Sequence, residues 1–368
     1  MELQQLGWND FFAEQFADIN PDGRIPGRVA YQHRTHYGVY TEGGELRAQT
    51  AGALRHRSVW MADLPAVGDW VVLLARPDEG TATITAVLQR RSSFSRKAVL
   101  SGGMPDTGGK TDEQVVAANI DTTFLVSGLD ADYNLRRIER YLAIAYDSGA
   151  SPVVILNKAD LCDDADTRIE EVGQVAFGMP IHLISALTGD GLDIFGEYLT
   201  KGKTAVLLGS SGAGKSTIIN ALLGREQLRT GAVREFDGRG RHTTTHRELI
   251  LLDGGGLVID TPGMREIAIW EDDEGLGSTF SEIEQLAVGC RFRDCTHVNE
   301  PGCAVLAALA EGALDQGRYQ NYLRLRKEIA HLRTRKDTKA RRQLERNMDK
   351  KIRNYFQERE RLRKKGLI

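Results

Sequence analysis

The stretch Gly209-Ser210-Ser211-Gly212-Ala213-Gly214-Lys215-Ser216 has the spacing of a phosphate-binding P-loop. Four apolar residues precede it and an amphipathic run follows it, which is the strand–loop–helix context that the motif requires. Backbone N–H groups in such a loop and the start of the helix both present positive charge to phosphate oxygens. We therefore expect a nucleotide here, with Lys215 reaching the β- and γ-phosphates and the Ser216 hydroxyl binding magnesium.

The tetrad Asn157-Lys158-Ala159-Asp160 follows an apolar run and has the pattern with which GTPases read guanine. Asp160 can accept hydrogen bonds from the guanine N1–H and 2-amino groups, and adenine offers no such pair of donors. The alternative is a strand-to-helix turn in which Asp160 is only a cap. Ser185 and Ala186, after the next apolar run, fit the loop that contacts the base by backbone N–H.

The order of these two motifs is informative, because the guanine tetrad lies about fifty residues before the P-loop. In an ordinary GTPase the P-loop comes first and the tetrad comes late. The parts are complete but rearranged, which indicates a circularly permuted GTPase. This order leaves the segment after Gly263 free to run into a following domain, and we expect it to tether the loop that senses the γ-phosphate to that domain.

Two further segments complete the predicted site. Asp260 ends an apolar run and is a candidate to hold magnesium through water, while the N–H of Gly263 fits the γ-phosphate contact. The polar segment 239–245 fits the loop whose threonine completes the magnesium shell, unless it is a plain polar loop. The candidates are Thr243, Thr244 and Thr245, and we count Thr244 and Thr245 among the GTP contacts.

The group that activates water is not where Ras-like enzymes carry it. The residue after Gly263 is Met264, at the position of the water-positioning glutamine, and a thioether cannot orient water. Hydrolysis must be slow, use another group, or be completed by a partner. His242 is the nearest candidate for a catalytic residue, and the alternative is a solvated loop histidine.

Three thiols and one imidazole lie within fourteen residues, at Cys290, Cys295, His297 and Cys303. A Cys3His set is a closed tetrahedral set that suits structural zinc. The alternative is a group of scattered buried thiols. Cys162 stands apart in a polar segment and is expected to be an ordinary thiol.

The elements that must position these residues fall into three expected domains and a linker. Residues 1–100 contain five short alternating runs, which favour a small barrel, either an OB fold or another small barrel. A Gly-rich linker is expected over 101–112 and an α/β GTPase domain with a mostly parallel sheet over 113–270. A helical zinc-binding domain with a basic tail is expected over 271–368. The expected α/β strands are Thr122–Val126, Pro152–Leu156, Ile181–Ile184, Thr204–Leu208, His246–Leu252 and Leu257–Asp260.

The charge of the chain is unevenly distributed. The net charge is −3, yet residues 318–365 hold nineteen Lys or Arg against six Asp or Glu. This basic tail suits RNA phosphates, although a solvated helix docked on its own domain is the alternative. Near the barrel edge, the sequence predicts a smaller basic patch of Arg90, Arg91, Arg96 and Lys97. We expect no membrane span, no secretory signal, a reducing cytoplasm and a monomer.

With these motifs in hand, the chain resembles the RsgA/YjeQ family of GTPases that depend on the small ribosomal subunit. The resemblance rests on the barrel, the permuted motif order, Arg241-His242-Thr243-Thr244-Thr245 and the cysteine spacing. It implies an N-terminal OB fold, a GTPase domain and a zinc-binding helical domain. It also implies late maturation of the small subunit, with GTP hydrolysis stimulated by that subunit. Phosphate binding would then extend from Gly209 to Thr217, and the resemblance favours His242 as the hydrolytic residue.

Two other functions stay open at this point. The chain could be a nucleotide-gated RNA-binding module or RNA chaperone whose GTP turnover is incidental. It could also be an ATPase, which would require tight ATP binding. Turnover measured with and without small subunits separates the first alternative from the expected function.

Overall fold

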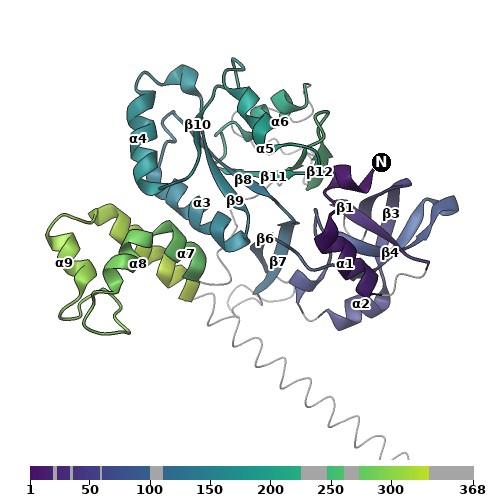
Figure 1. Ribbon diagram of the computed structural model, residues 1–368, viewed down its shortest axis with the longest axis horizontal. Coiled ribbons are helices and arrows are strands. Elements are labelled where there is room, and N and C mark those ends of the chain that lie inside the picture. Colours follow the sequence, from purple (N-terminus) through teal and green to yellow (C-terminus); the bar gives the residue numbers. More distant parts are fainter. Residues whose placement is uncertain are drawn as a thin grey trace, which may run out of the picture. The chain divides into compact units, whose positions relative to one another are not determined.

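The computed structural model of the chain describes residues 1–19, 23–33, 36–58, 60–99, 111–224, 247–260 and 273–330 (Figure 1). These residues form two compact units. The first comprises the described residues within Met1–Ile269 and Glu274–Gln285, and the second those within Trp270–Asp273 and Leu286–Ile368. Among the helices of these described residues, none combines the length and apolar character that crossing a membrane requires.

The first five strands close into a barrel, and the predicted OB fold is confirmed. The strands are β1 (Ile25–His33), β2 (His36–Thr41), β3 (Gly44–Thr50), β4 (Trp70–Arg76) and β5 (Thr81–Val87). They neighbour one another in the order β1-β2-β3-β5-β4, and β4 pairs back onto β1. Every neighbouring pair is antiparallel except β3–β5. Inward-facing side chains from all five strands form the barrel core.

The six strands predicted for the GTPase domain are all present. They are β8 (Thr122–Gly128), β9 (Ser151–Asn157), β10 (Ile181–Leu183), β11 (Thr204–Gly209), β12 (Glu248–Leu251) and β13 (Leu257–Asp260). Their order is β10-β9-β8-β11-β13-β12, and all neighbours are parallel except the antiparallel pair β12–β13. Every residue of β8 and β11 is buried, as expected for parallel strands covered on both faces.

Helices cover the two faces of this sheet (Figure 1). They are α3 (Leu135–Ser148), α4 (Ala165–Val175), α5 (Phe195–Tyr198) and α6 (Lys215–Leu222). Phe195 of α5 and Ile218 and Ile219 of α6 pack into one core with β8, β9 and β11, and α3 and α4 lie on the other side. Since the strands are parallel, the segments that follow β8, β9, β11 and β13 gather at one edge, where ligands bind in such sheets.

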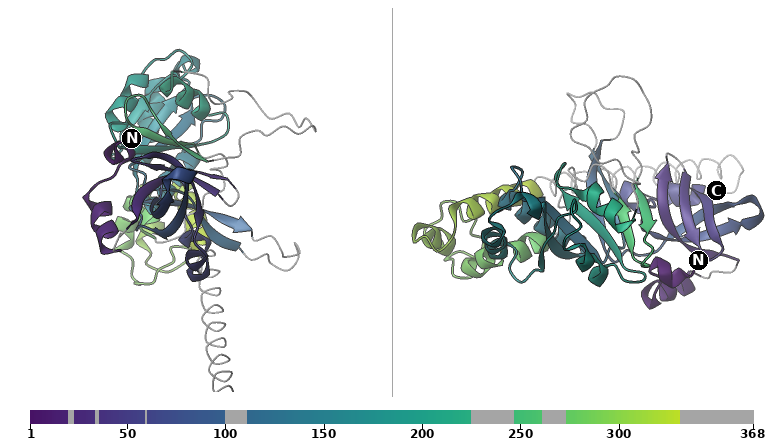
Figure 2. Two further views of the ribbon diagram at one scale, coloured as in Figure 1. Left: turned by 90° about the vertical axis from the view of Figure 1, so that its right-hand side faces the viewer. Right: turned by 90° about the horizontal axis from the view of Figure 1, so that it is seen from above.

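The barrel and the α/β sheet are joined by two connections that the sequence did not indicate. Strand β1 pairs with β12 at Tyr31 and Glu248, so both parts belong to one 11-stranded sheet, which Figure 2 shows from two further sides. The chain passes between them through the antiparallel hairpin of β6 (Ser93–Val99) and β7 (Thr111–Ala118). Of the predicted linker, residues 101–110 lie outside the described residues, and residues 111 and 112 open β7.

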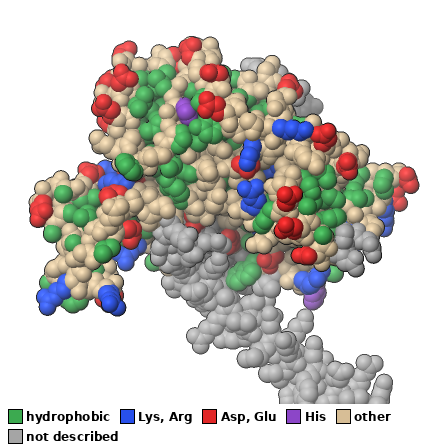
Figure 3. Space-filling view, in the orientation of Figure 1, with side chains coloured by type: hydrophobic (Ala, Val, Ile, Leu, Met, Phe, Trp, Pro, Cys, Tyr) green, Lys and Arg blue, Asp and Glu red, His purple; other side chains and the backbone are tan. Residues whose placement is uncertain are grey.

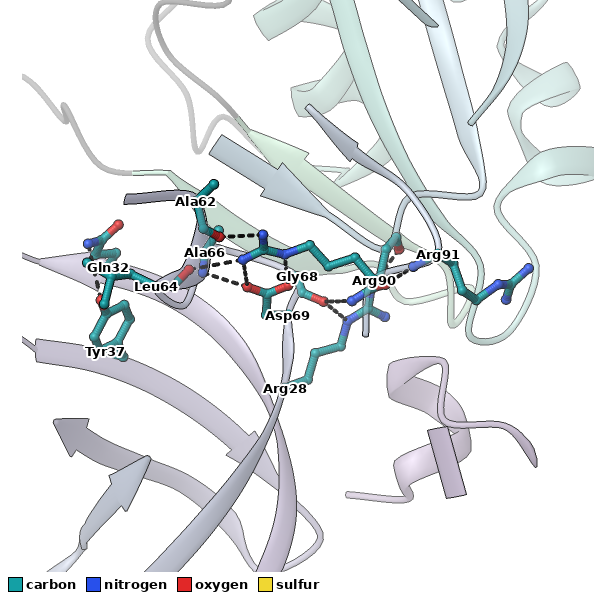
Figure 4. Close-up of polar contacts among 11 residues, drawn as sticks. Arg28, Gln32, Tyr37, Ala62, Leu64, Ala66, Gly68, Asp69, Arg90 and Arg91 are labelled. Atoms are coloured by element: carbon teal, nitrogen blue, oxygen red, sulfur yellow. Dashed lines mark hydrogen bonds and ion pairs between the residues drawn. The ribbon is translucent and has the colours of Figure 1, made fainter. Parts of the chain in front are cut away.

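A buried arginine, Arg28, connects the segments at this junction (Figure 4). Arg28 is buried and donates from Nε to the Gly68 carbonyl at 3.2 Å, from Nη2 to the Asn119 carbonyl at 2.9 Å and from Nη1 to the Leu6 carbonyl. Burial lowers the pKa of Arg28 to about 10. These bonds tie the N-terminal turn, the barrel and the segment between β7 and β8 to one guanidinium.

The prediction that Arg90 belongs to a basic surface patch is wrong, because its charge is paired inside the barrel domain. Its guanidinium forms a bidentate ion pair with buried Asp69, at 2.7 and 2.8 Å, and also donates to the carbonyls of Ala62 and Leu64. Asp69 lies in the turn that Arg28 also contacts (Figure 4). Arg90 is therefore a structural residue of the barrel, because its guanidinium is only 18% exposed and is already engaged by a carboxylate and two carbonyls. Arg91 is exposed and stays a candidate.

The remaining elements are short. In the first unit they are η1 (Leu3–Leu6), α1 (Asp10–Asp18), α2 (Gly52–Arg57), η2 (Met61–Asp63), η3 (Pro77–Glu79), η5 (Ala159–Leu161) and η6 (Leu192–Ile194). Helices α7 (Asp273–Thr279) and α8 (Ser281–Ala287) follow the sheet along the chain. The second unit contains α9 (Ala304–Ala310) and a helix over residues 316–330.

Candidate nucleotide and metal sites

The P-loop connects β11 to α6 with the backbone shape that its glycines permit. Gly214, at the start of α6, has φ +98°, and a Cβ there would lie 2.1 Å from Nδ2 of Asn157. A Cβ on Gly209 would lie 2.4 Å from the Val126 carbonyl oxygen. Only glycine fits both positions, because one needs a left-handed backbone and both need close approach to a neighbouring strand end. The loop is thus held against the ends of β8 and β9.

Asn157 links three parts of the predicted site. It is buried at the end of β9, and its Nδ2 donates to the Ala213 carbonyl of the P-loop at 2.8 Å. Its Oδ1 accepts from the backbone N–H of Ala186 at 3.0 Å. One amide of the guanine tetrad therefore contacts both the segment after β10, which is 29 residues further along the chain, and the P-loop, which is 56 residues further along.

Asp160 lies beside the segment that was expected to contact the base. Its Oδ1 accepts from the Ser185 hydroxyl at 2.6 Å, and Ser185 Oγ in turn accepts from the N–H of Thr188 at 3.2 Å. This bond holds Oδ1 of a side chain that is otherwise exposed. Lys158 is the N-cap of the short helix over Ala159–Leu161 and Asp164 is that of α4, so Asp160 is not the cap that the alternative required.

Lys215 and Asp260 bring opposite charges to the phosphate end of the site. Lys215 Nζ donates to the carbonyls of Gly209 and Ser210, at 2.9 and 2.6 Å. Burial raises the pKa of Asp260, and the nearby Glu248 carboxylate raises it further, while Lys215 opposes the shift. A divalent cation would offset both effects, and the Ser216 hydroxyl and the Asp260 carboxylate supply the hard oxygen ligands that magnesium prefers.

Several predicted residues lie outside the described residues. They are His242, Thr243, Thr244, Thr245, Gly263 and Met264. The structure brings together Asn157, Asp160, Ser185, Ala186 and the P-loop at the edge of the sheet. The hydrolytic group and the γ-phosphate contact remain predictions from the sequence.

The four predicted metal ligands converge in the second unit. The ligand atoms of Cys290, Cys295, His297 and Cys303 all lie within 4.8 Å of one another. Sγ of Cys290 is 3.8 Å from Sγ of Cys303, and Nδ1 of His297 is 3.6 and 3.5 Å from those two sulfurs. A tetrahedral zinc with bonds of about 2.3 Å to sulfur and about 2.0 Å to nitrogen has edges of about 3.8 and 3.5 Å. The cluster therefore fits a metal ion of this size.

The backbone around the cluster is held by residues that the sequence analysis did not single out. Glu300 accepts from the N–H groups of Thr296, Val298 and Asn299, at 2.9, 3.0 and 3.1 Å, and from the Thr296 hydroxyl. These bonds lower the pKa of Glu300 to about 2. Tyr319 donates its hydroxyl to the His297 carbonyl at 2.6 Å, and His297 has φ +62°. The ligand loop is thus fixed by its own hydrogen bonds.

An OB barrel joined to an α/β domain whose guanine tetrad precedes its P-loop defines the class of circularly permuted GTPases. A family model described as RsgA GTPase matches residues 87–270. The chain belongs to the RsgA GTPase family. A second model, described as 50S ribosome-binding GTPase, matches residues 204–348. That match begins at β11, the strand before the P-loop, where a GTPase of conventional order would begin.

The relatives cover nearly the whole chain. A protein of Opitutus terrae named small ribosomal subunit biogenesis GTPase RsgA is 47% identical over 98% of this chain and 99% of its own length. One of Syntrophotalea carbinolica with the same name is 46% identical over 90% of each chain. The crystal structure of YjeQ from Thermotoga maritima is 30% identical, with a TM-score of 0.59 over 84% of this chain and 98% of that one. YloQ, described as a circularly permuted GTPase, is 26% identical, with a TM-score of 0.57 over 85% and 96% of the two chains.

Proposed function

We propose that this chain hydrolyses GTP in the biogenesis of the small ribosomal subunit. The observation that carries this function is that Asn157 bonds both the P-loop and the segment 185–186, whose Ser185 holds the Asp160 carboxylate, in a chain 47% identical over nearly its full length to a small-subunit biogenesis GTPase. Adenine lacks the donors that Asp160 would meet, so the site favours GTP over ATP. The family also disfavours an RNA chaperone with incidental turnover.

Each part of the site has one task in this proposal. Asn157 and Asp160 bind and orient the base, and the residues from Gly209 to Thr217 hold the phosphates through backbone N–H groups. Ser216 and Asp260 would hold magnesium, with a threonine from 243–245, and the ion would neutralise phosphate charge as hydrolysis proceeds. His242 would orient the attacking water, and the Gly263 N–H would contact the γ-phosphate.

The metal in the second unit is zinc in this proposal. Four ligands close the coordination shell and leave no open position, which is the arrangement of a structural site. The distances among Cys290 Sγ, Cys303 Sγ and His297 Nδ1 fit the edges of a zinc tetrahedron, and Cys295 Sγ lies within 4.8 Å of all three. All four cysteines of the chain are free of disulfides, which supports a reducing cytoplasm as the setting. We also propose a monomer, because one chain supplies every residue of both sites.

The partner is the small subunit with its rRNA. The end of the α/β domain that carries α4 exposes Asp163, Asp164, Asp166 and Glu170, and acidic side chains gather there (Figure 3). Phosphate would be repelled at this surface. The basic residues of the tail offer the complementary charge, except Arg318, which is buried; those beyond 330 lie outside the described residues. The barrel, by the common use of OB folds, offers a second RNA surface.

The sheet supplies a route between nucleotide and barrel. Strand β12 begins at Glu248, three residues after Thr245, and pairs with β1 of the barrel at Tyr31. A change in the loop around His242 would therefore act on a strand that is hydrogen-bonded to the barrel. This route stands beside the tether after Gly263, which falls on residues 261–272, outside the described residues.

The His242 assignment is tested by His242→Ala. The variant is expected to lose about 100-fold in the rate of GTP hydrolysis measured with saturating small subunits, the usual order for one general acid–base or orienting group. Its affinity for GTP should stay close to that of the wild type. His246→Ala, a histidine four residues further along, is the matched control. A variant that hydrolyses GTP at the wild-type rate would contradict the assignment.

A further inference from the structure

The loop after β8, residues 129–134, carries two carboxylates that contact both nucleotide motifs. Asp130 Oδ2 accepts from Lys158 Nζ of the guanine tetrad at 2.5 Å. Asp132 Oδ2 accepts from the Ser210 hydroxyl of the P-loop and from Arg137 Nη1, the latter at 2.7 Å. Neither aspartate belongs to a motif that the sequence singled out.

The sheet order explains how one loop reaches both motifs. Strand β8 lies between β9, which leads into the tetrad, and β11, which leads into the P-loop. The Lys158 side chain therefore extends from the end of β9 over the end of β8, toward the phosphate side of the site. Asp160 reads the base on one side, and the P-loop lies on the other. A nucleotide whose base contacts Asp160 and whose phosphates lie in the P-loop would therefore lie against the Lys158 side chain.

The local backbone is built around this ion pair. Lys158 has φ +66°, a left-handed conformation that non-glycine residues rarely adopt and that is typical of functional sites. Gly128 ends β8 beside it, where a Cβ would lie 2.9 Å from Asp130 Oδ1 and 3.4 Å from Lys158 Cδ. The N–H of Asp132 donates to Asp130 Oδ1 at 3.1 Å, so the carboxylate is fixed on both oxygens.

The pair is partly open to water, and we expect its contribution to the free energy of folding to be modest. The Lys158 and Asp130 side chains are 26% and 29% exposed, and pairs that water reaches contribute little to the free energy of folding. A free lysine side chain, by contrast, loses considerable rotamer freedom when it is ordered against a ligand. An acid that already holds the lysine in place removes that cost from nucleotide binding.

We propose that Asp130 is a positioning residue for guanine nucleotides, acting through Lys158, with Asp132 fixing the loop to the P-loop. This inference rests on the proposed GTP site and adds a residue to it. Asp130 itself need not touch the nucleotide. Its contribution is to hold the Lys158 stem along the path between base and phosphates.

The test is a double-mutant cycle on the affinity for GDP, measured with the full chain by titration calorimetry. Asp130→Asn keeps the shape of the side chain and should weaken GDP binding by about tenfold, in line with the rotamer freedom that an unheld lysine must lose. In the Lys158→Met background the same substitution should have no further effect. Asp130→Glu, which restores the charge, should recover part of the affinity. The thermal unfolding midpoint without nucleotide should not change.

Asp163→Asn is the matched control, because it removes one exposed negative charge three residues after Asp160 and should leave GDP affinity unchanged. Wild-type or tighter binding by Asp130→Asn, or equal losses in both backgrounds, would overturn the positioning role. Asp160→Asn, measured in parallel, separates the two claims. If it weakens GDP binding while Asp130→Asn does not, only this inference fails, and if neither matters, the proposed site fails with it.

Discussion

Replacing Asp160 by asparagine is expected to weaken GTP binding by about 100-fold or more and to create affinity for xanthine nucleotides. In the proposed site the wild-type carboxylate would accept from guanine N1–H and the 2-amino group, and its Oδ1 already accepts from the Ser185 hydroxyl. An amide presents donors of its own to guanine, so buried polar groups stay unpaired, which is the source of large discrimination. Xanthine carries a carbonyl where guanine has the amino group, and it can accept from the new amide.

The measurement is a competition of GTP, XTP and ATP against a fluorescent guanine nucleotide. Asp163→Asn again controls for charge near the tetrad and should bind GTP as the wild type does. An Asp160→Asn variant that keeps its preference for GTP would show that another residue reads the base.

The second large effect concerns the metal. Cys303→Ser is expected to reduce zinc from about one ion per chain to near zero and to unfold the second unit, because structural zinc supplies about 10–16 kcal/mol in small zinc-folded domains. Cys303 is also the N-cap of α9, because its Sγ accepts from the N–H of Leu306 at 3.5 Å. Serine is itself a favourable N-cap residue, so the substitution removes the metal ligand while a hydroxyl can still cap the helix.

Metal analysis of protein purified without added zinc, combined with limited proteolysis, reads out both effects. Cys162→Ser removes a free thiol outside the cluster and should leave the zinc content and the proteolysis pattern as they are. GTP affinity should survive in both variants, because the nucleotide motifs belong to the first unit. A wild-type chain without zinc, or a Cys303→Ser variant that retains it, would exclude the proposed centre.

The parts of the fold that the sequence predicts are those written in local patterns. The alternating pattern predicts the five barrel strands. The apolar runs predict the six strands from β8 to β13, with first and last residues within two positions of those observed. The metal ligands are read from spacing because all four lie in one short segment. Asn157 and Asp160 are predictable for a similar reason, since a strand end and its tetrad are contiguous.

The parts that escaped prediction depend on contacts between distant segments. Hairpin β6–β7 pairs residues on either side of the segment 100–110, and the glycines there indicated a linker instead. Arg90 read as surface charge, because nothing local reveals that Asp69 lies buried beside it, 21 residues earlier. The contact of Asp130 with the guanine tetrad could not be predicted for the same reason, since its partner Lys158 is 28 residues away. Glu300 could have been noticed, because a carboxylate inside a ligand loop often binds the loop's own N–H groups.

The central claim, that this chain is a GTPase of small-subunit biogenesis, is tested most directly by GTP hydrolysis with and without purified small ribosomal subunits. The residue after Gly263 cannot orient water, so the chain alone should turn over slowly, and we expect a partner to complete the site together with His242. We expect small subunits to raise the rate by about 100-fold or more, as stimulating partners of GTPases commonly do, and large subunits to leave it unchanged. An equal rate with and without small subunits would contradict the account.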